Sequence, residues 1–255
     1  MRFSLPDGLE TELRAWGDGD QSVLCLHPLG QEAAYFGDLA AALGPGWRVV
    51  AYDQRGHGAA AGQPAKSFKQ MVDDAEAALR QCGASHVAGF SMGGAIASEL
   101  ARRRPPRTLT LAATPHKGLP VFVERARAVR EGSVEAVAEG TLARWFGDAA
   151  YEPAAERARA SLLRLSPEGF DAAWRAFATF EGYEERAVAL PPTLCLAYGN
   201  DLSTPPDVLD AIARAIRAGG GTAERETIPG AGHMGLLQKP AETAAAIARF
   251  VERHA

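Results

Sequence analysis

The 255-residue sequence lacks the cysteine pattern of a disulfide-rich or zinc-binding protein. Its three cysteines, Cys25, Cys82 and Cys195, are an odd number at long spacings, with no CxxC pair and no histidine cluster beside them. We therefore expect neither a disulfide framework nor a metal site. Cys25 and Cys195 lie in apolar runs typical of strands, so both are expected to be buried as small hydrophobic side chains.

The sequence also lacks long hydrophobic runs and an excess of positive charge. No segment approaches the roughly 20 apolar residues of a membrane-spanning helix, and the N-terminal residues lack the apolar core of a signal peptide. The formal net charge of −4 provides no basic field for a phosphate backbone. These absences predict a cytoplasmic protein whose partners include neither a membrane nor a nucleic acid; homo-oligomerisation stays open.

What the sequence does contain is an alternation of strand-like and helix-like segments. This alternation is typical of a mostly parallel sheet covered by helices on both faces, and it predicts the α/β class. The predicted strands are Phe3–Leu5, Thr11–Trp16, Ser22–Leu26, Arg48–Tyr52, His86–Phe90, Thr108–Ala113, Thr193–Tyr198 and Ala223–Ile228. The first two are expected to pair as an antiparallel hairpin. The predicted helices between the strands are Ala33–Leu43, Phe68–Cys82, Ser91–Arg104, Pro206–Ala218 and Pro240–Arg253.

One interval, residues 115–190, interrupts the alternation with helical patterning and no convincing strand. It is too long for a plain connection. We therefore expect residues 1–114 and 191–255 to form one core, with residues 115–190 as a helical cap inserted between two strands. Aromatic residues are only 7% of the chain, and the interval concentrates several of them, some of which are expected to line a pocket. They are Trp145, Phe146, Trp174, Phe177, Phe180 and Tyr183.

A G-x-S-x-G motif, Gly89-Phe90-Ser91-Met92-Gly93, directly follows a predicted strand and precedes a predicted helix. A serine on such a tight turn has strained backbone geometry and an exposed Oγ, and the glycines avoid clashes with neighbouring strands. The motif in this position predicts a catalytic serine.

A serine nucleophile needs a general base that is itself oriented by an acid. Among the six histidines, His233 follows the last predicted strand in a glycine-rich loop. Asp201 follows the strand before it, so Ser91, Asp201 and His233 all come at C-terminal strand ends, where open α/β sheets place their sites. They are the predicted catalytic triad, with Asp207 and Asp210 in the next helix as weaker alternatives to the acid.

Three of the other histidines have structural interpretations. We expect His57 to stabilise a turn by hydrogen bonding, and His86 and His254 to be structural. The oxyanion of an acyl-transfer reaction needs two N–H donors, and Met92, directly after the serine, supplies one. The loop His27-Pro28-Leu29-Gly30 should supply the other, and because Pro28 has no N–H we assign it to Leu29.

Taken together, these stretches resemble the α/β-hydrolase fold family over essentially the whole chain. The matching segments are residues 27–30, 52–58, 89–94, Asp201 with Thr204-Pro205, and Gly232-His233 with Pro240. The resemblance implies an eight-stranded, mostly parallel sheet flanked by helices. It also implies a serine hydrolase that needs no metal or other cofactor.

Within the interval 115–190, residues 125–132, 142–146 and 166–170 are similar to the cap of 3-oxoadipate enol-lactonases. This similarity implies hydrolysis of a small, carboxylate-bearing enol-lactone of aromatic catabolism through an acyl-enzyme. Arg144 and Trp145 would then bind the substrate, the guanidinium meeting the carboxylate and the indole covering the ring. The alternatives are a general carboxylesterase, a haloperoxidase-like esterase, a carbon–carbon hydrolase, a lyase and a receptor that retains the fold.

Overall fold

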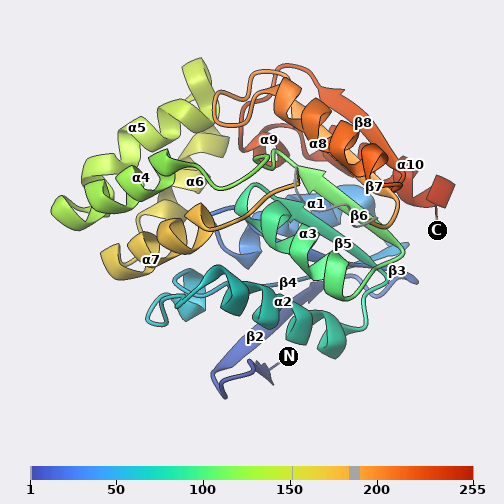
Figure 1. Cartoon of the computed structure of the whole chain (residues 1–255), viewed down its shortest axis with the longest axis horizontal. Helices are drawn as coiled ribbons and strands as arrows, with labels where there is room; N and C mark the ends of the chain where they lie inside the picture. The colour runs from blue at the N-terminus through green and yellow to red at the C-terminus, as the bar shows by residue number, and fades with distance from the viewer. Residues whose placement is uncertain (1, 151, 184–189, 255) are drawn as a thin grey trace.

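The computed structural model describes residues 2–150, 152–183 and 190–254, and a single twisted sheet runs through its centre (Figure 1). The strands are β1 (Arg2–Ser4), β2 (Glu10–Trp16), β3 (Gln21–Leu26), β4 (Trp47–Tyr52), β5 (His86–Phe90), β6 (Thr108–Ala112), β7 (Thr193–Tyr198) and β8 (Ala223–Ile228). Their order is β1-β2-β4-β3-β5-β6-β7-β8. The expected hairpin is confirmed, because β1 pairs antiparallel with β2, and β2 pairs antiparallel with β4. All other pairs are parallel, as the sequence predicts.

Helices cover both faces of the sheet. Figure 1 shows α2, α3 and α8 on the viewer's side and α1 behind the strands. Helix α1 packs against α10, and α2 packs against α3. The bounds are η1 (Ala33–Phe36), α1 (Gly37–Leu43), η2 (Gly58–Ala60), α2 (Phe68–Cys82), α3 (Met92–Arg103), α8 (Pro206–Ala218), α9 (Gly235–Gln238) and α10 (Pro240–His254). Because the parallel strands all end at one edge, the loops that follow β3, β5, β7 and β8 converge there.

The predicted helix 33–43 differs from the structure, which divides it into the 3₁₀ turn η1 and helix α1. The Asp53 carboxylate accepts a hydrogen bond from the Ala33 N–H at 2.7 Å and so holds the start of η1. The tighter turn buries both Tyr35 and Phe36.

Between β6 and β7 the described residues form helices and loops but no strand, and in Figure 1 the helices lie together to the left of the sheet. They are α4 (Pro120–Glu131), α5 (Val134–Phe146), η3 (Gly147–Ala149), α6 (Pro153–Leu162) and α7 (Pro167–Ala178). Three of them, α4, α6 and α7, begin at a proline, a residue that fits the first helical turn. The predicted cap also includes residues 151 and 184–189, which lie outside the described residues. Its function as a cap stays a prediction.

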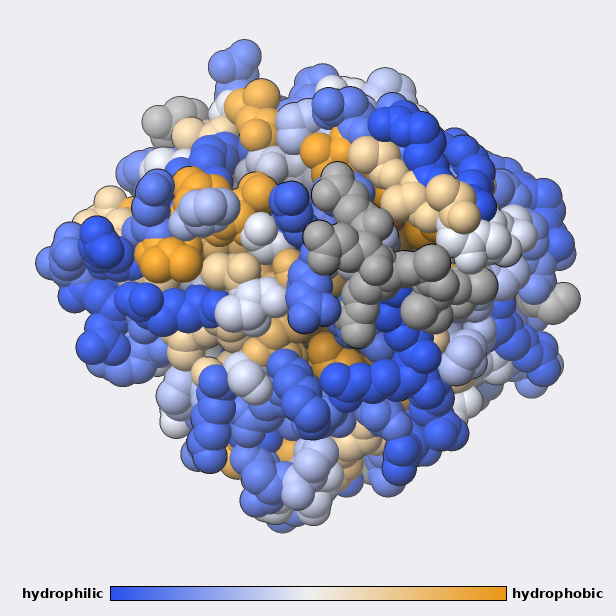
Figure 2. Space-filling view, viewed as in Figure 1, coloured by the Kyte–Doolittle hydropathy of each residue, from blue (hydrophilic) through white to orange (hydrophobic). Residues whose placement is uncertain are grey.

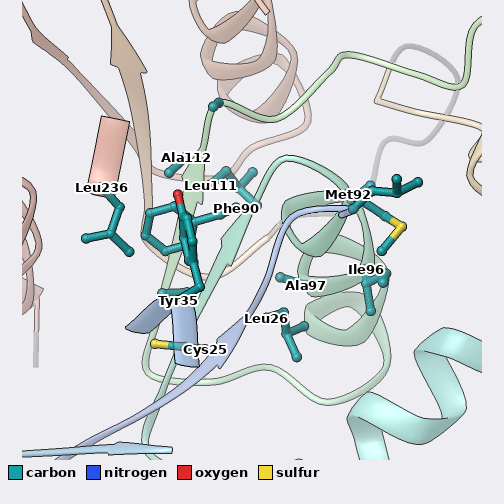
Figure 3. Packing of buried hydrophobic residues seen from close by; sticks show 14 of the residues in the cluster. Cys25, Leu26, Tyr35, Phe90, Met92, Ile96, Ala97, Leu111, Ala112 and Leu236 are labelled. Atoms are coloured by element: carbon teal, nitrogen blue, oxygen red, sulfur yellow. The ribbon is translucent and has the colours of Figure 1, made fainter. Parts of the chain in front are cut away.

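The chain on both sides of Ser91 is anchored in the core. The Phe90 ring lies 5.8 Å from the Tyr35 ring and 5.4 Å from the Phe36 ring, centroid to centroid. Figure 3 shows Tyr35 beside the end of β5, and Met92 beside Ile96 on α3. Phe90 and Met92 are almost completely buried. This packing holds the turn between β5 and α3 in place.

All three cysteines are free and buried, so the expected burial of Cys25 and Cys195 is confirmed. Burial raises the pKa of the Cys195 thiol to about 12. The protonated thiol of a buried cysteine is chemically unreactive.

The face shown in Figure 2 is largely hydrophilic, with small apolar areas over the helices between β6 and β7. The exposed large apolar side chains are Leu119, Val123, Leu163 and Leu202. Within the described ranges, no helix combines the length and the apolar character needed to cross a bilayer.

Candidate active site

Ser91 occupies a sharp turn between β5 and α3. Its backbone has φ 51° and ψ −117°, a left-handed conformation that residues other than glycine rarely adopt. A side chain on Gly93 would collide with the Leu26 carbonyl oxygen, and one on Gly89 would collide with the Gly93 carbonyl oxygen. The turn therefore has the strain and the close backbone approach that the G-x-S-x-G motif predicts.

The structure brings the three predicted triad residues into one hydrogen-bonded chain. The Ser91 Oγ lies 2.9 Å from the His233 Nε2, and the His233 Nδ1 lies 2.7 Å from the Asp201 Oδ2. All three residues are buried: the exposed fraction is 8% for Ser91, 5% for His233 and 3% for Asp201. Because a carboxylate only accepts, Nδ1–H donates to Asp201, and Nε2 is left to accept the serine proton. This is the tautomer that a general base requires.

The acid is oriented by the loop that follows β7. The second oxygen of Asp201, Oδ1, accepts hydrogen bonds from the Ser203 N–H at 2.7 Å and the Thr204 N–H at 2.8 Å. With the imidazole, these donors fix the carboxylate in place. The alternative Asp210 instead forms an ion pair with Arg225 at 2.7 Å.

The predicted oxyanion donors lie next to the serine. Leu29 follows β3 and lines the cavity that contains Ser91 and His233, and Met92 is the first residue of α3. Within the described part of the chain, neither main-chain N–H donates a hydrogen bond to another residue. Buried N–H groups without an acceptor are rare in folded proteins. These two are free to bind a negatively charged oxygen.

Two buried histidines hold the loop that carries Leu29. The Gly30 N–H donates to the His57 Nε2 at 3.1 Å, and the His57 Nδ1–H donates to the Arg55 carbonyl at 2.9 Å. The expected role of His57 in stabilising a turn is thus confirmed. The His27 Nε2 accepts from the Gln54 N–H at 3.0 Å in the same region. Burial lowers the pKa of His57 to about 3 and also lowers the pKa of His27, so both rings are neutral.

His86 and His254 have the structural contacts that the sequence predicts. The His86 ring bonds Thr108 and Gln21 at the opposite ends of β5 and β6 from Ser91. The His254 Nε2 lies 2.7 Å from a Glu224 carboxylate oxygen. Neither ring reaches the candidate site.

A cavity adjoins Ser91 and His233, and helices of the insertion form much of its wall. Three of the predicted aromatic residues line it: Trp145, Trp174 and Phe177. The other three, Phe146, Phe180 and Tyr183, are buried outside the lining. Across the described residues, no group of three or more His, Cys, Asp or Glu side chains could hold a metal ion.

The arginine in this cavity differs from the one that the sequence predicts. Arg144 is not part of the lining, and its guanidinium donates to the Thr141 Oγ1 at 2.9 Å. Arg125 on α4 lines the cavity instead. A sequence signal for it exists, because Arg125 falls in the buried stripe Phe122, Ala126, Val129 of α4. A charged residue at helical spacing within an apolar stripe calls for a functional explanation.

Comparisons with known proteins identify the family of the chain. The family model described as "Alpha/beta hydrolase family" matches residues 23–246. The chain is 27% identical over 261 residues to "sn-1-specific diacylglycerol lipase ABHD11" from Mus musculus, covering 92% of this chain and 83% of that protein. It is 28% identical over 192 residues to "3-oxoadipate enol-lactonase 1" from Acinetobacter baylyi, covering 71% of each.

A solved structure shares the fold over nearly its full length. The crystal structure of a hydrolase from Pseudomonas aeruginosa superimposes with a TM-score of 0.88 at 27% identity. The superposition covers 98% of this chain and 97% of that one.

Proposed function

Since the chain belongs to the alpha/beta hydrolase family, we propose that it is a serine-dependent hydrolase of small carboxylic esters or lactones. One observation carries the proposal: Ser91, His233 and Asp201 form a continuous hydrogen-bonded chain beside two buried N–H groups that lack acceptors. Nucleophile, base, orienting acid and oxyanion donors are the parts that acyl transfer needs. The relatives named as a lipase and a lactonase support the same class of reaction.

In the first half of the reaction, the Ser91 Oγ attacks the carbonyl carbon while the His233 Nε2 takes its proton. The carbonyl oxygen becomes an oxyanion and accepts hydrogen bonds from the Leu29 and Met92 N–H groups. Each such donor is worth about 3 kcal/mol in the transition state. His233 then gives the proton to the leaving alcohol oxygen, the C–O bond breaks, and Asp201 stabilises the imidazolium throughout.

In the second half, His233 removes a proton from water, and the hydroxide oxygen attacks the acyl carbon. The bond to the Ser91 Oγ breaks, and His233 returns the proton to that oxygen. With a lactone, the alcohol stays attached to the acyl group, so the product is one ring-opened molecule.

Within this class, we propose that the specific substrate is a small lactone such as 3-oxoadipate enol-lactone. A relative with that activity in its name and the similarity of residues 125–132 to such caps support this choice. Trp145, Trp174 and Phe177 supply apolar walls of the kind that cover a small ring.

Hydrolysis in ¹⁸O-labelled water tests the reaction class. The enzyme should place one solvent oxygen in the carboxylate of each product molecule, since water opens the acyl-enzyme, and mass spectrometry of the product detects it. The substrates are a panel of small lactones and esters, with the Ser91→Ala protein as the control for background hydrolysis. Enzymatic turnover without label would identify a lyase and refute the proposal.

Replacing His57 with alanine should lower kcat about 10-fold to 100-fold, because small displacements of a catalytic group are costly. The Gly30 N–H would lose its acceptor, and the Leu29 N–H beside it would shift. The free energy of unfolding should also fall, by about 1–3 kcal/mol for the orphaned donor. Steady-state kinetics and urea unfolding measure the two effects.

His86→Ala is the matched control for this variant. It also removes a buried, neutral, hydrogen-bonded ring, but one far from Ser91 along β5. We expect a loss of stability with kcat nearly unchanged. Equal losses of kcat in the two variants would show that His57 does not position the oxyanion loop.

A further inference from the structure

The cavity beside Ser91 contains a positive charge for which the described residues supply no counter-charge. The Arg125 side chain is half-buried, and within the described residues no carboxylate lies within ion-pair distance of its guanidinium. Its contacts are the faces of two rings, at 5.7 Å from the Phe122 centroid and 5.1 Å from the Trp174 centroid. A partly buried cation is normally paired, so this one is available to an anion from outside the chain.

The surroundings of Arg125 destabilise its positive charge. Burial, and to a smaller extent the nearby charge of Arg144, lowers the pKa of Arg125 to about 10. The guanidinium is still protonated at neutral pH. A ligand with a negative charge would offset both the desolvation of Arg125 and its repulsion from Arg144.

Trp174, whose ring lies against the Arg125 guanidinium, also has an N–H donor without a partner in the described part of the chain. The Trp174 Nε1 is buried, and among the described residues it has no hydrogen-bond partner. The whole side chain is 94% shielded, since the residue is only 6% exposed. A buried indole N–H usually finds an acceptor. Trp174 and Arg125 both line the cavity, and among the described residues neither the indole N–H nor the guanidinium has a hydrogen-bond partner.

We propose that Arg125 and Trp174 form a subsite for a carboxylate of the substrate. This inference rests on the proposed function and deepens it: the substrate is a small ester or lactone with a second, unreacted carboxylate. The guanidinium fork binds such a group through two charge-assisted hydrogen bonds. Anchoring this end of the substrate would direct its ester carbonyl to Ser91, which lines the same cavity.

Two activated esters of similar size test the subsite. The p-nitrophenyl monoester of succinic acid carries a free carboxylate, whereas p-nitrophenyl butyrate is neutral. The native enzyme should have the lower KM for the succinate ester. Arg125→Gln should raise that KM about 10-fold to 100-fold, which corresponds to the loss of a charge-assisted hydrogen bond. It should change the KM for the butyrate ester by less than about threefold.

Three further variants sharpen the result. Arg127→Gln removes an exposed arginine two residues away on the same helix and should change neither KM. Arg125→Lys keeps the charge without the planar fork and should give an intermediate KM for the anionic ester. Arg144→Gln should have a small effect on the anionic ester. An equal rise in KM for both esters in Arg125→Gln would overturn the assignment. So would a rise in KM for the anionic ester that occurs only in Arg144→Gln.

Binding without turnover separates the subsite from the reaction. Succinate should raise the thermal midpoint of Ser91→Ala and should fail to do so in the double variant Ser91→Ala, Arg125→Gln. If the native enzyme hydrolyses neither ester, the proposed function fails, and the succinate shift still decides the subsite. If both esters are hydrolysed without preference and succinate has no effect, the subsite is refuted and the proposed function stands.

Discussion

Ser91→Ala should lower kcat/KM for any accepted ester by about 10⁴-fold or more. The variant loses the nucleophile, and His233 loses the group whose proton it takes. Residual activity would come from binding and from the Leu29 and Met92 N–H groups, which the substitution leaves in place. Alanine at position 91 keeps the backbone turn, so circular dichroism and the thermal midpoint should stay close to those of the native protein.

Ser203→Ala is the matched control for this substitution. Ser203 lines the same cavity, and it orients Asp201 through its main-chain N–H, which alanine retains. Its hydroxyl is 3.5 Å from the Arg144 carbonyl and does not contact the triad. We expect kcat within about threefold of native, in line with a side chain outside the reacting groups. Near-native activity of Ser91→Ala would refute the mechanism.

Acidification should destabilise the folded protein well before its carboxylates are protonated. Burial lowers the pKa of His57 to about 3, and burial with nearby Arg107 lowers the pKa of His86 to about 4. Each ring is neutral when folded, whereas the unfolded chain binds a proton near the usual pKa of about 6.5. The stability from these groups is therefore fully present above about pH 6.5 and is lost as the pH falls toward the folded pKa values.

The expected loss between pH 7 and pH 5 is about 2 kcal/mol for each of His57 and His86, and His27 adds to it in the same direction. Together these losses are a large part of the free energy of unfolding of a typical domain, which is roughly 5–15 kcal/mol. Urea unfolding at a series of pH values measures it. Glutamine cannot titrate, so His86→Gln should reduce the slope of the free energy of unfolding against pH by the contribution of about one proton. A stability that is constant from pH 7 to pH 5 would contradict the neutral, buried state of these rings.

The main elements of the candidate site follow from local sequence. The position of Ser91 depends on a turn whose glycines are read directly from the motif. Asp201 and His233 are far from it in sequence, yet parallel strands place their C-terminal ends at one edge, so topology brings the three together. The main-chain donor at Leu29 follows from the missing N–H of Pro28. Each of these inferences needs only one strand end and one loop.

The cavity wall was harder to predict because it depends on how helices pack on one another. Arg144 and Arg125 both lie on helices of the insertion, and neighbouring residues in the sequence do not say which side chain faces Ser91. Helix α4 packs against α7, and this contact turns Arg125 and Phe122 toward Trp174. The support of the Leu29 loop by His57 was likewise only partly predicted. The turn contact was expected, but its partner Gly30 lies 27 residues away.

Ser91 should carry the acyl group during turnover. Acid quenching during hydrolysis of a p-nitrophenyl ester, followed by peptide mass spectrometry, tests it most directly. We predict one acyl group per chain, on the peptide that contains Ser91, and none on the Ser91→Ala protein. Continued turnover with no acylated peptide, or with the acyl group on another residue, would contradict the account.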